Sequence, residues 1–477
     1  MTQPLTAAYG AFIAQLKYKA LPQAVVSVAR QGFTDCTGVM LAGSREPVTA
    51  AIERVLRADN PDGPAHLYFS SKRTSAPAAA WINGTAAHAL DYDDVALKGS
   101  HPSAVLVPAI LAEAQALGAT GRDMLVAYAA GYEVWADLIA RERGNYQRKG
   151  WHPTGVFGAL GAAAACASLH GLDASASAHA LGIAASAASG VMSNLGSMVK
   201  PTHPGAAAAS GIYAARFAAA GVTATADALE HAQGLLAALS PGGDVDLDTP
   251  PRLPPRQWQS AQQGLSIKQY PVCYRAHRAI DAMLGLLRLQ PVAARDVGEI
   301  RVSFSNSHRV ILKNHRPRTA IAAKFSIEFA LACALLNGRV GLRDLTDEFV
   351  RSAAVRKLME RVAIDINPVE EPGTSGYAPF DSVAITRADG TVLASENVRY
   401  ALGDPHAPLT ADDLWAKFND CAAWSRLKLD AEMLFAQLQS LEKLESVNGL
   451  FNRRPPATRK QPVVQRRAIR AQIAPAG

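Results

Sequence analysis

Apolar residues recur at three- and four-residue spacing through most of the first 265 residues, which is the period of an amphipathic α-helix. The pattern is clear at Ala24, Val25, Val28 and Ala29, and it returns between residues 124 and 132. Glycine and proline divide this part of the chain into segments of helical length. Since no convincing strand pattern interrupts it, we predict that this part folds as helices alone.

The period changes after Pro291. Residues 300–304 alternate apolar and polar side chains, as a strand with one buried face does, and residues 364–366 repeat the alternation. Two further runs within residues 383–394 flank Asp389-Gly390, which predicts a hairpin with a tight turn. Helices are expected in between, at residues 322–337 and 345–360.

The helical pattern returns after Thr410, a plausible N-cap, over residues 412–417 and 427–445. The simplest architecture is mainly α. Residues 1–267 and 401–451 form a large all-helical domain, and residues 268–400 are inserted as a smaller α+β lid domain. Residues 452–477 are rich in proline and arginine and are expected to form a basic tail with little order.

The net charge of +7 equals the seven basic residues that follow Glu445, the last acidic residue, so the rest of the chain is neutral. A nucleic-acid surface would be confined to this tail, which has no aromatic side chain to stack on bases. We therefore expect neither nucleic acid nor a membrane as partner. The five cysteines are scattered without a CxxC pair, and no secretory signal is visible, so a cytoplasmic location is predicted.

Short polar segments stand out among the apolar helices. Three of them contain His-Pro, at His101, His152 and His203. A following proline disfavours the helical conformation of the histidine, so these side chains are expected at helix boundaries, where free N–H groups favour an anion. The first and third segments also contain Asp91 and Lys200. A fourth segment adds Lys268, Tyr270, Arg275 and His277.

These residue types suit proton abstraction next to a carboxylate. The step needs a base with a pKa near the working pH, either a histidine or a desolvated aspartate. The developing negative charge needs fixed cations, a role open to Lys200, Lys268 or Arg275. We see neither a Schiff-base signature nor a metal motif. The glycine run at 155–161 lacks the preceding strand of a nucleotide loop and is interpreted as a helix contact. No cofactor and no metal are expected.

Some of the polar residues also have a purely structural explanation. His88 is alternatively a packed histidine that hydrogen-bonds within the core, and Asp93 with Asp94 an N-cap or a solvated pair. Asp91 with His101 and His152 would alternatively hold the divalent metal of a hydrolase, although no HExxH or comparable spacing is present.

Together these segments resemble the MmgE/PrpD family over residues 5–450. The similarity is most specific at residues 83–94 with 101–103, at 150–162, at Lys200 with His203-Pro204-Gly205, at 270–281 and at 323–326. The resemblance implies a large helical domain with a smaller lid domain, a homodimer and no cofactor. Family members include 2-methylcitrate dehydratases, cis-aconitate decarboxylases and iminodisuccinate epimerases.

The resemblance also implies roles. His101 and His152 would carry protons, and Asp91 would orient a histidine or act as base. Lys200 and His277 would hold carboxylates, and Lys268, Tyr270, Arg275 and His203 are further candidates for substrate binding. The expected enzyme is a lyase that dehydrates or decarboxylates a small di- or tricarboxylic acid, similar to 2-methylcitrate dehydratase. An isomerase of such an acid is the alternative. Val95 replaces a threonine common in the family, which weakens the case for methylcitrate.

Overall fold

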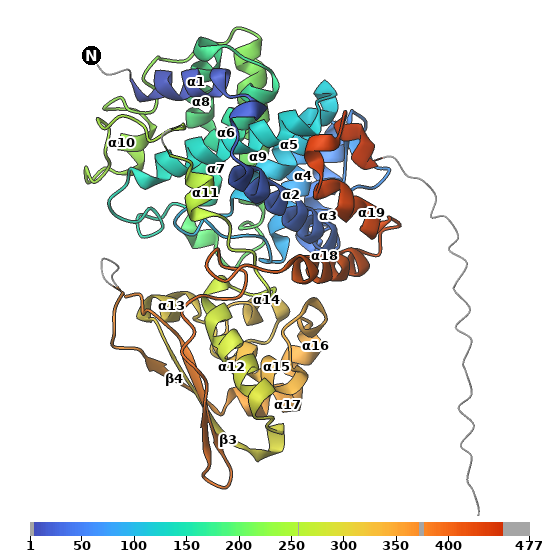
Figure 1. The fold of residues 1–477 in the computed structure, drawn as a ribbon, viewed down its shortest axis with the longest axis vertical. Helices are drawn as coiled ribbons and strands as arrows, with labels where there is room; N and C mark the ends of the chain where they lie inside the picture. Colours follow the sequence, from blue (N-terminus) through green and yellow to red (C-terminus); the bar gives the residue numbers. More distant parts are fainter. Residues whose placement is uncertain (1–3, 256, 372–375, 452–477) are drawn as a thin grey trace, which may run out of the picture.

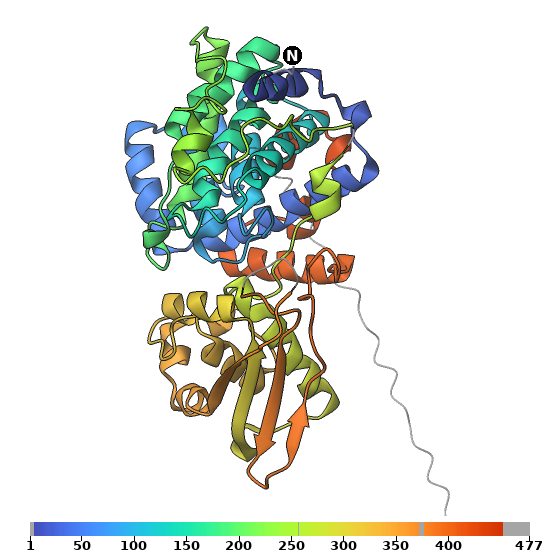
Figure 2. The same ribbon diagram turned by 90° about the vertical axis from the view of Figure 1, so that its left-hand side faces the viewer.

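The computed structural model of the protein describes residues 4–255, 257–371 and 376–451. Its buried side chains form two main clusters. The larger contains residues 5–267 together with 414–450 from the end of the chain, and the second contains residues 270–385. Figures 1 and 2 show the corresponding bodies, one made of helices and a smaller one with a sheet. The fold is mainly α, as predicted.

The helical body begins with eleven helices, four or more turns long in several cases. They are α1 (Leu5–Gln15), α2 (Gln23–Gly43), α3 (Pro47–Asp59), α4 (Ala76–Ala89), α5 (Pro102–Leu117), α6 (Gly121–Ala140), α7 (Pro153–Leu169), α8 (Ala174–Ala187), α9 (Thr202–Ala219), α10 (Leu235–Leu239) and α11 (Gln259–Gln263).

Helix α7 is the centre of this body and packs against α5, α6, α8 and α9. Its side chains are mostly alanine and glycine, and all of them from Pro153 to Ala167 are buried. A Cβ atom at Gly158 would lie 2.9 Å from Val105, and one at Gly161 would lie 2.9 Å from the ring of Trp135. The glycine run therefore serves close helix packing, as expected, because larger side chains would separate the helices.

The end of the chain returns to the helical body through α18 (Ala411–Ser425) and α19 (Ala431–Leu438). Thr410 caps α18 in a reciprocal pair with Asp413, which confirms the predicted N-cap. Helix α18 packs along α2 and lies next to the smaller body in both views. Lys417 of α18 forms a buried ion pair with Asp35 of α2, at 2.5 Å, and donates to the carbonyl oxygen of Tyr92 at 3.0 Å.

The smaller body contains one four-stranded sheet in the order β4-β3-β5-β6. Strand β3 (Val297–Phe304) pairs in parallel with β4 (Val362–Ile366) and antiparallel with β5 (Ser382–Arg387), and β5 continues into β6 (Val392–Ala394). Ile300, Val302 and Phe304 are buried, which confirms the alternation predicted at 300–304, and the antiparallel pairing of β5 with β6 confirms the hairpin. The residues of β4 are all half-buried, so the alternation predicted at 364–366 is not seen in burial. The helices of this body are α12 (His277–Leu289), α13 (Asn306–Ile311), α14 (Ala320–Ala323), α15 (Ile327–Asn337), α16 (Asp347–Arg351) and α17 (Ala353–Met359).

Some predicted elements were wrong in extent. The helices expected at 322–337 and 345–360 are each split, because Ser326 and Ser352 accept hydrogen bonds from backbone N–H groups three residues later and start new helices there. The first half also contains a pair of two-residue strands, β1 (Ala65–His66) and β2 (Arg73–Thr74), that its pattern did not indicate. Within the described residues, every helix is too short or too polar to cross a membrane.

The close contact around α7 gives a stability prediction. In Gly131→Ala the new Cβ atom would lie 2.6 Å from the carbonyl oxygen of Gly161, so α6 and α7 must move apart, at a cost of about 1–3 kcal/mol of unfolding free energy. The control is Gly285→Ala in α12, where the nearest atom is the end of the Arg288 side chain at 3.8 Å. This change should leave stability equal or raise it by up to about 1 kcal/mol. Urea unfolding measures both, and equal effects would contradict the packing argument.

Candidate active site

The polar segments meet at a cleft of about 440 Å³ between the two bodies. His101 and His152 are the N-caps of α5 and α7, with extended backbone, as the following prolines predicted. Lys200 lies just before α9, and His203 lies in the first turn of that helix. Five of the predicted residues line the cleft from the helical body or the segment that leaves it, and Arg275 lines it from the smaller body. The five are Asp91, His101, His152, Lys200 and Lys268.

The cleft carries an excess of positive charge. Its lining contains four cationic side chains, Lys98, Lys200, Lys268 and Arg275, and one carboxylate, that of Asp91. The lining also contains four apolar side chains, Met192, Leu195, Ile311 and Phe325. A site of this kind favours a small molecule with several negative charges and a short carbon skeleton.

Asp91 holds two of the lysines. Its carboxylate forms a close ion pair with Lys200 and lies 3.4 Å from Nζ of Lys268, which also donates to the backbone oxygen of Asp91 at 2.7 Å. All three side chains are buried. Burial alone would raise the pKa of Asp91, but Lys200 and Lys268 outweigh it and hold that pKa well below its usual range. In turn Asp91 outweighs the effect of burial on Lys200 and raises its pKa. Asp91 is therefore an anion and Lys200 a cation.

The backbone at Asp91 is unusual. Its φ angle is 53°, in the left-handed region that residues other than glycine seldom adopt. Such a conformation costs of order 1–3 kcal/mol and persists only where the surroundings enforce it. Here the two lysine contacts and the turn after α4 do so.

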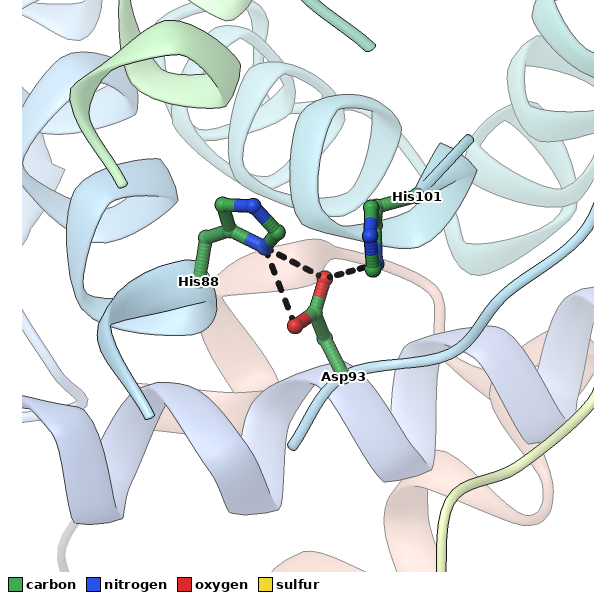
Figure 3. A group of neighbouring side chains, drawn as sticks. All are labelled: His88, Asp93 and His101. Carbon is green, nitrogen blue, oxygen red and sulfur yellow. Dashed lines mark hydrogen bonds and ion pairs between the residues drawn. The ribbon is translucent and has the colours of Figure 1, made fainter. Parts of the chain in front are cut away.

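Asp93 contacts two histidines, whereas the sequence analysis considered Asp91 either as the residue that orients a histidine or as the base. Figure 3 shows its carboxylate between the rings of His88 and His101. The distances to the Nδ1 atoms are 2.9 Å for His88 and 3.0 Å for His101. Nδ1 of His101 also lies 2.8 Å from the backbone oxygen of Asp94, so this nitrogen donates a proton to both acceptors. Nε2 of His101 remains available to a molecule in the cleft.

Burial decides the protonation of the neighbouring groups. It lowers the pKa of His88 to about 3 and, against hydrogen bonds from Ser103, raises the pKa of Asp94 to about 8. Burial would also raise the pKa of Asp93, but His88 and His101 keep it well below its usual range. The interpretation of Asp93 and Asp94 as a solvated pair is wrong, because neither has exposed surface. His88 is packed in the core and hydrogen-bonded there, as its structural interpretation expected.

His152 is hydrogen-bonded to another histidine, His203. Its Nδ1 atom lies 2.9 Å from Nδ1 of His203, so one ring donates and the other accepts. Burial, and then the positive charges that surround it, lower the pKa of His152 well below its usual value. His203 is thus not in contact with the cleft itself; it lies behind a residue that is.

Two other predicted substrate ligands lie elsewhere. The hydroxyl group of Tyr270 donates to Asp281 at 2.5 Å, and Nε2 of His277 lies 3.2 Å from the backbone oxygen of Val272. Both side chains are buried, and neither is among the described residues that line the cleft. The sequence analysis did not single out Lys98, which lines the cleft, or Lys324, which is buried beside it and donates to the oxygen of Ala89 at 3.3 Å.

Among the residues that the structure describes, one group of side chains has the geometry to hold a metal ion. It consists of His88, Asp93 and His101, whose ligand atoms lie within 4.8 Å of one another. It differs from the set of Asp91, His101 and His152 proposed for a hydrolase. Both Nδ1 atoms in the group point at the carboxylate of Asp93 and donate hydrogen bonds to it, which leaves no lone pair there for an ion. The group fits a hydrogen-bonded network better than a metal site.

The sequence of the chain matches one family over most of its length. Residues 8–248 match the MmgE/PrpD N-terminal domain and residues 270–441 match the MmgE/PrpD C-terminal domain. The chain belongs to the MmgE/PrpD family.

Its curated relatives include several lyases. The chain is 26% identical to the mouse (Mus musculus) cis-aconitate decarboxylase over 94% of its length and 93% of that protein. It is 28% identical to the human (Homo sapiens) cis-aconitate decarboxylase over 78% of each chain. It is 26% identical to the cis-aconitate decarboxylase of Aspergillus terreus (strain NIH 2624 / FGSC A1156) over 66% of its length and 69% of that protein. The prediction of an enzyme of the lyase class is confirmed.

The depressed pKa of His88 predicts how stability depends on pH. The unfolded chain protonates this histidine below pH 6.5, while the folded chain resists protonation down to about pH 3. The unfolded state then binds more protons, so this group lowers stability as the pH falls from 6.5. In His88→Gln the unfolding free energy that is lost between pH 6 and pH 4 should be smaller than in the original protein by about 1.4 kcal/mol per pH unit.

Urea unfolding from pH 4 to pH 7.5 measures this slope. The control is His231→Gln, which replaces an exposed histidine and should keep the slope of the original protein. An unchanged slope in His88→Gln would show that the folded state accepts the proton.

Proposed function

We propose that this protein is a carboxy-lyase that removes CO₂ from a small unsaturated tricarboxylic acid of the cis-aconitate type, without a cofactor. The observation that carries the proposal is the charge of the cleft, which has four cations against one carboxylate. The excess of three positive charges matches a tricarboxylate. The names of the relatives support the same chemistry.

In the proposed reaction the cleft binds and orients the substrate carboxylates through Lys200, Lys268 and Arg275. As the bond to the departing CO₂ breaks, its electron pair moves into the unsaturated skeleton, and negative charge grows at the far carboxylates. Fixed cations in a buried site stabilise that charge without reorganisation. The departing group loses its charge on becoming CO₂, which suits the apolar part of the lining near Phe325.

We assign the proton that ends the reaction to a histidine, His101 or His152. In each, Nδ1 is held in a hydrogen bond, and Nε2 has no hydrogen-bond partner within the described part of the chain, so we assign the contact with the substrate to Nε2. We propose that Asp93 orients His101. Asp91 has a strongly lowered pKa, which makes it a poor base, so we assign it to keeping Lys200 charged and to holding Lys200 and Lys268 in place.

The proposal extends to the smaller body, the oligomeric state and the location of the protein. We propose that residues 268–400 act as a lid domain over the cleft, that the chain forms a homodimer, and that it works in the cytoplasm. A dehydratase similar to 2-methylcitrate dehydratase is the second candidate within the lyase class, and an epimerase shares its first step. Both would use the same cations.

Proton NMR in D₂O, with chelator present, tests the function. Given cis-aconitate, citrate, methylcitrate and aspartate-type acids separately, the protein should consume cis-aconitate and form CO₂ and a dicarboxylate that carries one new deuterium. Loss of water from a hydroxy acid would instead establish the dehydratase. Deuterium exchange without a new product would establish the epimerase, and activity that chelation removes would revive the hydrolase.

Asp93→Asn tests the role assigned to Asp93. An amide cannot stabilise a protonated His101 and no longer fixes its tautomer, so kcat should fall about 10²–10⁴-fold with a smaller change in KM. The control is Asp365→Asn, an exposed carboxylate paired with Arg301 on the sheet, which should keep full activity. Full activity in Asp93→Asn would refute the orienting role.

A further inference from the structure

His152 and His203 form a hydrogen-bonded pair with one ring at the cleft and the other partly exposed to solvent. His152 is 3% exposed and lines the cleft, whereas His203 is partly exposed at the start of α9. Their Nδ1 atoms are 2.9 Å apart, and their ring centroids 5.1 Å. A hydrogen bond therefore connects the interior of the cleft with a side chain that water can reach.

The backbone keeps both rings in this arrangement. The N–H group of His152 donates to the oxygen of Gly190 at 3.0 Å, which fixes the start of α7. The ring of His203 lies against Gly190, where an added Cβ atom would come within 3.4 Å of its Nδ1 atom, and a Cβ atom added at Gly155 would come within 3.4 Å of the Cβ atom of His203. His203 thus has little freedom to turn away from His152.

The proposed reaction needs a supply of protons. Decarboxylation replaces a bond to a carboxylate carbon by a bond to hydrogen, so each turnover consumes one proton. Because burial and the surrounding positive charges keep His152 neutral, it can give a proton from Nε2 only if Nδ1 receives another one, since a neutral imidazole is a very weak acid.

Four titratable groups act on His152: His88 from α4, His101 at the start of α5, and Lys200 and His203 from the start of α9. The first three are buried. His203 alone among these four is partly exposed, and it alone is hydrogen-bonded to the His152 ring.

We propose that His203 is a relay residue that passes protons from solvent to His152 during the proposed decarboxylation, on which this inference rests. The carbon that loses CO₂ keeps the electron pair of the broken bond within the substrate, and a substrate carbon takes the proton from Nε2 of His152. Nδ1 of His152 takes the proton from Nδ1 of His203, and Nε2 of His203 takes one from water. The sum is one carboxylate and one proton in, and one C–H bond and CO₂ out.

Three variants distinguish proton transfer by His203 from a role in which His203 only positions the ring of His152. His203→Asn keeps a donor close to the former Nδ1 position but cannot pass a proton on. His203→Ala removes both functions and leaves space for free imidazole. His179→Asn is the matched control, since His179 is a partly buried histidine on α8 whose Nδ1 accepts from the N–H group of Ala224.

With cis-aconitate as substrate, we expect kcat to fall about 100-fold in both His203 variants, with KM changed less than about threefold, and to stay unchanged in His179→Asn. Added imidazole should restore the kcat of His203→Ala in proportion to the concentration of imidazolium. The pH profile of kcat should then follow the titration of the added imidazole. Full activity in His203→Asn, or a loss that imidazole leaves untouched, would overturn the relay.

Failure of the proposed function can be told apart from failure of the relay. If the original protein does not decarboxylate cis-aconitate, the function is refuted, and NMR of ¹⁵N-labelled histidine then decides the relay. The signals of His152 and His203 should titrate together in the original protein, and His152 should lose this dependence in His203→Asn. Independent titration would overturn the shared hydrogen bond on which the relay depends.

Discussion

The buried contact of Asp91 with Lys200 and Lys268 is the interaction on which the site depends. It joins the turn after α4, the segment before α9 and the segment that leads into the smaller body. Removing one partner would leave a buried charge uncompensated, which costs far more than the pair contributes. The same contact places two cations at the cleft and explains why a strained backbone is tolerated at Asp91. The same ion pairs therefore determine both the positive charge that the two lysines bring to the cleft and the backbone conformation at Asp91.

Around that contact the protein uses the starts of long helices to position its histidines. His101 and His152 are N-caps, and proline at the next position fixes where α5 and α7 begin. The rigid part of each helix lies deep in the core, where α7 is packed through alanine and glycine. Ring positions at the cleft are thus set by the packing of whole helices, and the hydrogen bonds that link His101 to Asp93 and His152 to His203 set the ring orientations.

Much of this could be predicted from sequence, because periodicity and proline position report directly on local backbone. The helical half, the strand alternation at 300–304, the cap at Thr410 and the helix-boundary histidines followed from such local rules. Which of the two carboxylates, that of Asp91 or that of Asp93, contacts the histidines did not. The two residues are two positions apart in the same polar segment, and only the left-handed turn at Asp91 decides which carboxylate meets the lysines. The positions of Tyr270, His277 and His203 depended likewise on long-range packing that no local pattern encodes.

The return of the chain to its first domain has a consequence for folding. Lys417 lies on α18, yet it forms an ion pair with Asp35 on α2 and donates to the backbone oxygen of Tyr92, between Asp91 and Asp93. During synthesis the helical body emerges first but lacks this partner until the whole α+β unit has been made. Contacts so distant in sequence form late. The turn that carries Asp91 and Asp93 therefore acquires this contact only after α18 has been made, so a chain that stops before α18 lacks part of the support of the cleft.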